Sequence, residues 1–218
     1  MLERITRRER FDLIVAWLAI SVAFSLAFSG GVGVFMGSTG QEITLGEYLV
    51  FLILSMVTVG VGFVLHELAH KFTAMHYGYW AEFRKDNLML LVAVVLAALV
   101  GVVFAAPGAT MIYGAGITRE QNGKISAAGP LTNLLLCIPF ALMLLLSGWF
   151  TPIGTGWNLL SLIGMVGLQV NAMIAAFNML PVSVLDGRKV LAWNPVVFMV
   201  LIVAAFGILL ATFSPLVL

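Results

Sequence analysis

Long apolar runs separated by short polar segments make up most of the sequence. Five runs have at least the ~20 residues that a membrane-crossing helix needs, and these are 11–36, 48–75, 126–149, 158–178 and 195–217. A sixth apolar run, residues 88–106, is close to that length. The intervening polar segments are 1–10, 37–47, 77–87, 117–125 and 182–194. The pattern predicts an all-α polytopic membrane protein, and we expect one domain over residues 1–218.

Composition supports lipid as the solvent of this chain. Hydrophobic residues make up 61% of it and charged residues only 10%, whereas soluble domains carry about 25% charged residues. The net charge of +1 gives no electrostatic case for nucleic acid as a partner. The single cysteine, Cys137, can form no intrachain disulfide. These observations exclude a nucleic-acid-binding protein and favour membrane lipid as the surroundings.

A short segment after the sixth apolar run has a different pattern. Residues 108–126 contain β-branched and aromatic residues together with an Asn122-Gly123 turn signal. We therefore expect a short membrane-associated strand or hairpin near residues 108–125.

The positive charges test whether the run 88–106 crosses the membrane. The eleven positive charges are Arg4, Arg7, Arg8, Arg10, Lys71, Arg84, Lys85, Arg119, Lys124, Arg188 and Lys189. If all six runs cross, the last four face the side opposite to the N-terminus; if residues 88–106 turn back, all eleven share one side. The positive-inside rule favours the second arrangement, and Pro107-Gly108 suits such a reversal. We predict five full spans, a re-entrant segment at 88–106 and a cytoplasmic N-terminus.

The second run ends in FVLHELAHKFTAMH, which carries an H-E-x-x-H motif. His66 and His70 are one helical turn apart on the same face, so both imidazoles can bind one Zn²⁺. Glu67 lies about 100° further round the helix and can reach a water molecule rather than the metal. Ionisable residues are costly in an apolar helix and usually functional there. The motif predicts a metal site with Glu67 as general base.

Catalytic zinc needs a third protein ligand, and the residues offer two candidates. His76 gives the metzincin spacing, but Thr73 replaces the glycine that allows that motif's turn, and on a continuing helix His76 points elsewhere. Asp186 follows the run 158–178, although an aspartate before Gly187 is also an ordinary turn residue. Residue types alone leave both candidates open.

Three motifs in order resemble the site-2 protease family of intramembrane zinc metalloproteases. They are HELAH at 66–70, AAGPLTN at 127–133 and NMLPVSVLDG at 178–187, which resemble the family's H-E-x-x-H, A-G-P-x-x-N and N-x-x-P-x-x-x-L-D-G. They frame a catalytic core of about residues 48–190. The chain departs from the common pattern in the extra apolar run 88–106, and we expect no appended PDZ or CBS module.

The resemblance implies one Zn²⁺ per chain, held by His66, His70 and Asp186. It makes Glu67 the catalytic residue. Asn178 resembles the family asparagine that holds the substrate backbone or oxyanion, and Asn133 would be a structural or active-site polar group. The implied function is an intramembrane endopeptidase of a prokaryotic cell membrane that cleaves transmembrane protein or peptide substrates.

The depth of the motif connects the ligand set with the topology. His66 is about 18 residues into the run 48–75, or roughly 27 Å, so it lies near the exit side of that span. Asp186 can reach the same depth only if residues 158–178 emerge on that side, which requires the re-entrant arrangement of 88–106. We therefore expect an active site nearer the cytoplasmic face.

Three other functions remain open. A membrane metal transporter or channel would also place His and Glu in spans, but along a pathway rather than at one depth. A catalytically inactive relative would bind membrane proteins without cleaving them. A metzincin-like protease would use His76 as its third ligand.

Overall fold

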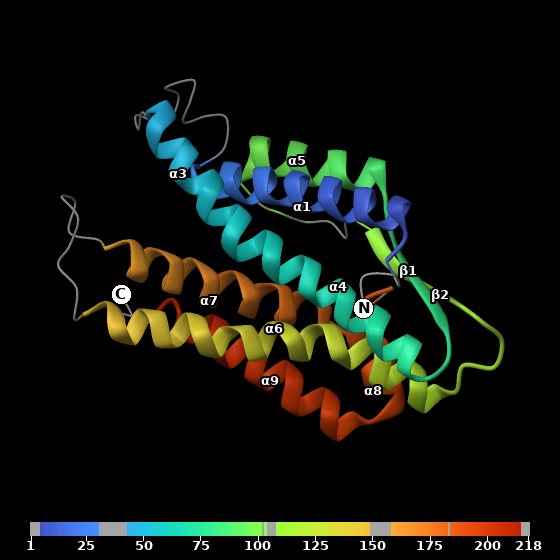
Figure 1. Cartoon of the computed structure of the whole chain (residues 1–218). Coiled ribbons are helices and arrows are strands. Elements are labelled where there is room, and N and C mark those ends of the chain that lie inside the picture. The colour runs from blue at the N-terminus through green and yellow to red at the C-terminus, as the bar shows by residue number, and fades with distance from the viewer. Residues whose placement is uncertain are drawn as a thin grey trace. The chain divides into compact units, whose positions relative to one another are not determined.

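The computed structural model describes residues 5–30, 43–101, 103, 108–148, 158–182 and 184–214, and these are mainly helical (Figure 1). Backbone contacts group the chain into two compact units. Unit 1 comprises Met1–Val64 and Glu82–Met111, and unit 2 comprises Leu65–Ala81 and Ile112–Leu218. One protease domain over residues 1–218 stays a prediction.

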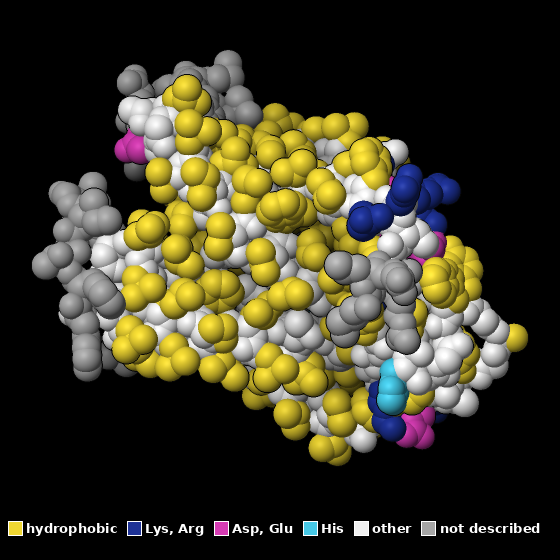
Figure 2. Space-filling view, in the orientation of Figure 1, with side chains coloured by type: hydrophobic (Ala, Val, Ile, Leu, Met, Phe, Trp, Pro, Cys, Tyr) yellow, Lys and Arg dark blue, Asp and Glu magenta, His cyan; other side chains and the backbone are white. Residues whose placement is uncertain are grey.

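Four helices of the described residues are long and apolar enough to cross a membrane. They are α1 (Arg7–Phe28), the helix Leu45–His76, α6 (Arg119–Ser147) and α7 (Leu159–Asn178). Two shorter apolar helices are α5 (Asn87–Val100) and α9 (Pro195–Ala211). Figure 2 shows hydrophobic side chains along the outward helix faces, as expected of a membrane protein. The count of five spans stays a prediction, because α9, which replaces the expected span 195–217, has only 17 residues.

Unit 1 is built around α1, which packs against both α3 (Leu45–Ser55) and α5 (Figure 1). The helix Leu45–His76 consists of α3, a π-helical turn η2 (Met56–Gly60) and α4 (Val61–His76). At the π turn the Trp17 indole nitrogen donates to the Met56 carbonyl oxygen at 3.0 Å. A Cβ on Gly60 would lie 1.8 Å from the Trp17 ring, so glycine is what allows this close approach.

Polar contacts within unit 1 join the start of α1 to residues 82–85 of strand β1 (Trp80–Lys85). The Glu9 carboxylate accepts a hydrogen bond from the Phe83 backbone N–H at 3.0 Å, and Arg84 pairs with Asp12 at 3.5 Å. Gly108 returns to the same place, since a Cβ there would lie 2.4 Å from the Arg84 carbonyl oxygen. Arg84 and Gly108 therefore lie side by side at one end of unit 1, although 23 residues separate them in the sequence.

Helix α5 accounts for much of that excursion. Asp86 caps its start by accepting from the Leu88 and Met89 N–H groups, and Gly101 ends it in a left-handed conformation (φ 73°) that favours glycine. With 14 residues α5 is about 21 Å long, less than the ~30 Å hydrocarbon core of a bilayer. Residues 102 and 104–106 of the predicted re-entrant segment, and Pro107 after it, lie outside the described residues.

The strand predicted after residue 108 is present, but the hairpin is not. Strand β2 (Gly108–Tyr113) pairs with β1 in a two-stranded sheet, and β1 falls in the segment 77–87 that the sequence marked only as polar. The turn expected at Asn122-Gly123 was wrong, because both residues lie inside α6. A capping box starts α6 at Thr118, whose side chain accepts from the Gln121 N–H while the Gln121 side chain accepts from Thr118.

Unit 2 is a helical bundle in which α6 and α7 run antiparallel (Figure 1). The Asn158 side chain, which caps α7, donates to the Ser147 carbonyl oxygen at the end of α6 at 2.7 Å. At the opposite ends, α8 (Asp186–Trp193) and α9 complete a buried apolar cluster of Ala127, Met179, Val190, Phe198 and Leu201. This cluster brings the start of α6, the end of α7 and the whole of α8 together, and the polar site lies beside it.

Candidate metal centre

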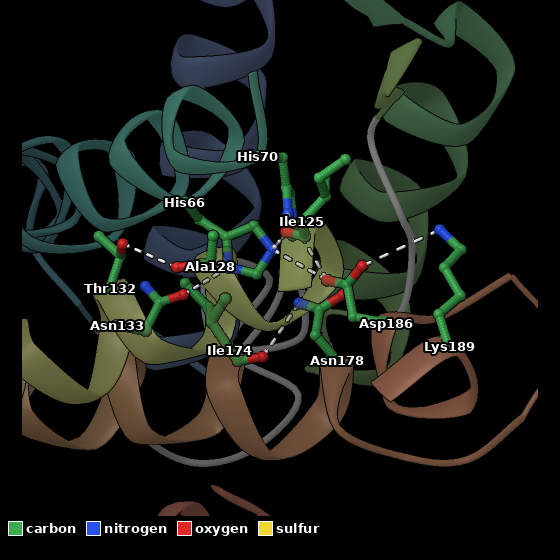
Figure 3. Close-up of polar contacts among 10 residues, drawn as sticks. All are labelled: His66, His70, Ile125, Ala128, Thr132, Asn133, Ile174, Asn178, Asp186 and Lys189. Atoms are coloured by element: carbon green, nitrogen blue, oxygen red, sulfur yellow. Dashed lines mark hydrogen bonds and ion pairs between the residues drawn. The ribbon is translucent and has the colours of Figure 1, made fainter. Parts of the chain in front are cut away.

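Three side chains of unit 2 converge on one point (Figure 3). The Nε2 atoms of His66 and His70 are 3.0 Å apart, and the Asp186 Oδ2 atom lies 3.4 Å and 3.1 Å from them. Ligands about 2.05 Å from a tetrahedral zinc ion lie about 3.3 Å from one another, which is close to the sides of this triangle. The three residues thus fit one Zn²⁺ and leave a fourth position for water or substrate, which is the arrangement of a catalytic zinc site.

Gly129 of α6 makes room for this point. A Cβ at that position would lie 2.4 Å from His70 Nε2 and 2.6 Å from His66 Nε2. Any side chain would therefore collide with the Nε2 edges of both imidazoles and displace them. Pro130 follows, and its ring removes a backbone N–H from the helix at this level.

His70 is oriented by a backbone group. Its Nδ1 atom lies 2.8 Å from the Ile125 carbonyl oxygen of α6. Because a carbonyl oxygen can only accept, Nδ1 carries the hydrogen, and the lone pair of the neutral ring is on Nε2, facing Asp186. The His70 tautomer is therefore the one that binds a metal through Nε2.

His66 is oriented through a chain of two buried asparagines. The Asn171 amide donates to the Gly167 carbonyl oxygen at 2.8 Å, which fixes its Oδ1 as the acceptor of the Asn133 amide at 2.9 Å. Asn133 Oδ1 is then left to accept from His66 Nδ1 at 2.6 Å. The chain ends at a backbone carbonyl, so it fixes the tautomer of His66 with Nε2 free of hydrogen.

Asp186 reaches the histidines because of where α8 begins. A Cβ on Gly187 would lie 2.1 Å from the Met179 carbonyl oxygen, so glycine lets α8 start directly against the end of α7. The second carboxylate oxygen of Asp186, Oδ1, lies 4.0 Å from Lys189 Nζ (Figure 3).

The other predicted site residues fall in different places. Glu67 is buried on α4 directly after His66, and Asn178 ends α7 beside Asp186 (Figure 3), where its amide donates to the Ile174 carbonyl oxygen at 3.0 Å. Asn133 contacts His66 rather than the open side of the site. His76 is exposed at the end of α4 against the Tyr77 ring, away from the cluster.

Two groups that orient the histidines, the Asn171 side chain and the Ile125 carbonyl, were not predicted from the sequence. Asn171 is one of the few polar residues within the apolar run 158–178, and a polar residue in an apolar helix is usually functional. The Ile125 carbonyl could not have been found from side chains, because any residue supplies that oxygen.

The cluster has the arrangement of a metallohydrolase centre. Two histidines and an aspartate surround an open position, and a glutamate follows the first histidine. Comparison with known proteins agrees. The chain is 39% identical over 208 residues, 95% of each chain, to the Methanocaldococcus jannaschii protein named "Putative zinc metalloprotease MJ0611". The chain belongs to the family of this zinc metalloprotease.

Two bacterial proteins with the same description are more distant. Rip2 of Mycolicibacterium smegmatis is 30% identical over 56% of this chain and 50% of its own, and YwhC of Bacillus subtilis is 27% identical over 62% and 66%. No family model and no solved structure matches the chain. Membership of a zinc metalloprotease family makes the chain a hydrolase, and one Zn²⁺ fits its three-ligand cluster.

Proposed function

We propose that this protein is an intramembrane zinc endopeptidase of the site-2 protease class that cleaves transmembrane segments of other membrane proteins. The observation that carries the proposal is the triangle of His66, His70 and Asp186, with sides of 3.0–3.4 Å. Its two histidines lie on a helix, Leu45–His76, that is long and apolar enough to span a membrane. The family relationship to zinc metalloproteases supports the hydrolytic chemistry.

The chemistry follows from the groups around the triangle. A zinc ion bound there would polarise the scissile carbonyl and lower the pKa of a water molecule toward about 7. Glu67 takes the proton from the attacking water and passes it to the leaving amine. The Asn133–Asn171 chain and the Ile125 carbonyl hold both imidazoles in place while this happens. Asn178, at the end of α7, stabilises the oxyanion through its amide.

A helical substrate must unwind before its peptide bonds can be attacked, and the sheet offers a partner for the extended chain. At the outer edge of β1, the Phe83 N–H is already bonded to Glu9. The outer edge of β2 is then the edge on which a substrate segment adds as a strand. Tyr113, exposed at the end of β2, lies on that strand.

The positive charges support a cytoplasmic N-terminus and a site near the cytoplasmic face. In unit 1, the basic residues at the start of α1 and in β1 lie at one end, the end to which Gly108 returns. In unit 2, α6 begins with Arg119, and His70 bonds to Ile125 only six residues, about 9 Å, later. By the positive-inside rule both ends face the cytoplasm, which makes 88–106 re-entrant.

The test is the Glu67→Gln variant of the full chain in proteoliposomes with a transmembrane peptide substrate. Cleavage should fall by about 10²–10⁴-fold, the usual contribution of a general base, while zinc content stays at one per chain. The matched control is Glu120→Gln, which removes an exposed carboxylate paired with Lys124 and should leave cleavage unchanged. Undiminished turnover by Glu67→Gln, or zinc flux without proteolysis in the unaltered chain, would contradict the proposal.

A further inference from the structure

A second site in unit 2 lies beside the metal centre. It is a cavity of about 420 Å³ lined by Arg119 and Asn122 of α6, Arg188, Lys189 and Ala192 of α8, and Val184. This volume is within the ~300–1,000 Å³ range of small-molecule pockets. We propose that this cavity binds the phosphate headgroup of an anionic membrane lipid.

The charge of the lining determines the class of ligand. Three cationic side chains converge on the cavity from two helices, and no Asp or Glu is among the described residues that line it. Of the two nearby carboxylates, Glu120 pairs with Lys124 on α6, whereas Asp186 directs Oδ2 to the histidines and Oδ1 to Lys189 at 4.0 Å. The cavity therefore has three cationic groups against one neighbouring carboxylate. Guanidinium groups bind phosphate oxygens in pairs, and Asn122 adds an amide donor.

The apolar part of the same surface selects a lipid over a soluble phosphate. Val184, which lines the cavity, is 74% exposed, and Val182 and Leu191 are exposed large hydrophobic residues on the same segment and helix. Arg119 is the first residue of a helix long enough to span the bilayer, so its charge lies at headgroup level. A basic pocket at the cytoplasmic end of membrane helices, with apolar surface beside it, suits a lipid phosphate and the first carbons of its chains.

The site also has a consequence for the metal centre. Lys189 lines the cavity and lies 4.0 Å from Asp186 Oδ1, and Arg188 is its neighbour on α8. A bound headgroup would hold α8, and with it Asp186, against the ends of α6 and α7. This inference rests on the membrane topology proposed above but not on peptide cleavage.

The experiment measures lipid retention by the full chain in mixed micelles by native mass spectrometry, using the Glu67→Gln protein so that cleavage plays no part. Phosphatidylglycerol should be retained over phosphatidylcholine. Removing two charges, in the double variant Arg119→Gln/Arg188→Gln, should weaken phosphatidylglycerol binding by roughly 30-fold. The double variant Arg119→Lys/Arg188→Lys keeps both charges but loses the paired guanidinium contacts, so its binding should fall between that of the unaltered residues and that of the glutamine variant. Lys85→Gln, which removes a charge outside the cavity, should leave phosphatidylglycerol binding unchanged.

Three results would overturn the proposal. One is equal retention of the two lipids, and another is unchanged phosphatidylglycerol binding in the double glutamine variant. The third is displacement of the lipid by an equal concentration of inorganic phosphate, which would assign the cavity to a soluble anion. Suppose that the chain shows no preference for phosphatidylglycerol and yet binds zinc and, with Glu67 restored, cleaves its substrate. That result would refute the lipid site and leave the proposed protease function standing.

Discussion

Among the buried acidic side chains, Glu9 of unit 1 and Asp186 of unit 2 have opposite kinds of partner. In unit 1, Glu9 is fully buried and its carboxylate accepts the Phe83 backbone N–H. In unit 2, Asp186 is buried against two imidazole nitrogens whose hydrogens are on the far side of each ring. The first acid meets a donor that satisfies it, and the second meets two further acceptors.

The partner atoms of a buried carboxylate indicate whether it is structural or functional. A carboxylate bonded to a backbone donor contributes to stability, because an unsatisfied buried group costs about 1–3 kcal/mol. A carboxylate aimed at two lone pairs repels them unless a cation lies between. Burial alone therefore does not distinguish a structural acid from a functional one, whereas the type of partner atom does. Four substitutions test this comparison.

Removing the third ligand should have the largest effect. Asp186→Ala should weaken zinc binding by more than about 100-fold, since even loss of a group that only orients a ligand costs about 10–100-fold. Zinc content after dialysis against a chelator series measures it. His76→Ala is the control and should bind zinc normally; the reverse result would move the third ligand to His76.

Filling the space in front of the histidines should act almost as strongly. Gly129→Ala places a methyl carbon 2.4 Å from His70 Nε2 and 2.6 Å from His66 Nε2, which must displace the imidazoles, so stoichiometric zinc should be lost. Gly148→Ala, at the other end of the same helix, has no atom within 4 Å of the added carbon and should be neutral. Full zinc content in Gly129→Ala would mean that the ion lies elsewhere.

Breaking the Asn133–Asn171 hydrogen-bond chain should lower zinc affinity by less than the two substitutions above. Asn133→Ala leaves His66 Nδ1 without its acceptor, so zinc affinity should fall by about 10–100-fold. Thr132→Ala, whose hydroxyl donates to the Ala128 carbonyl oxygen within α6, should change it little. If Asn133→Ala bound zinc normally but cleaved poorly, Asn133 would act on the substrate instead.

Substitution of Glu9 should lower the stability of the fold and leave zinc binding unchanged. Glu9→Ala leaves a buried N–H unsatisfied and should lower the free energy of unfolding by about 1–3 kcal/mol without changing zinc content. Thermal unfolding in detergent, together with metal analysis, measures both. The control Arg10→Ala, at an exposed neighbouring position, should change neither the free energy of unfolding nor the zinc content. Zinc loss in Glu9→Ala at temperatures where the chain is folded would end the comparison between the two acids.

Much of the helical pattern was predictable because the bilayer restricts it. Apolar runs of sufficient length must be helices in lipid, and α7 at Leu159–Asn178 matches the expected run 158–178 within a residue. Helix starts were less predictable, since α6 begins seven residues before its apolar run. Its capping box at Thr118 and the packing of Gly123 against Trp193 convert a turn-like Asn-Gly pair into helix. Lys71 was counted among the positive charges of the cytoplasmic side, yet it is fully buried with Trp80 beside it.

The sequence by itself determined the membrane character, the two histidines one turn apart and the glutamate between them, because hydropathy and helical periodicity are local properties. Only the tertiary structure brought Asp186, more than a hundred residues away, within 3.1 Å of His70, and assigned Asn133 and Asn171 to holding His66. Those contacts depend on Gly129 and Gly187 letting α4, α6, α7 and α8 approach closely. Which distant segments meet depends on how side chains fill the space between helices, and that is a property of the packed bundle.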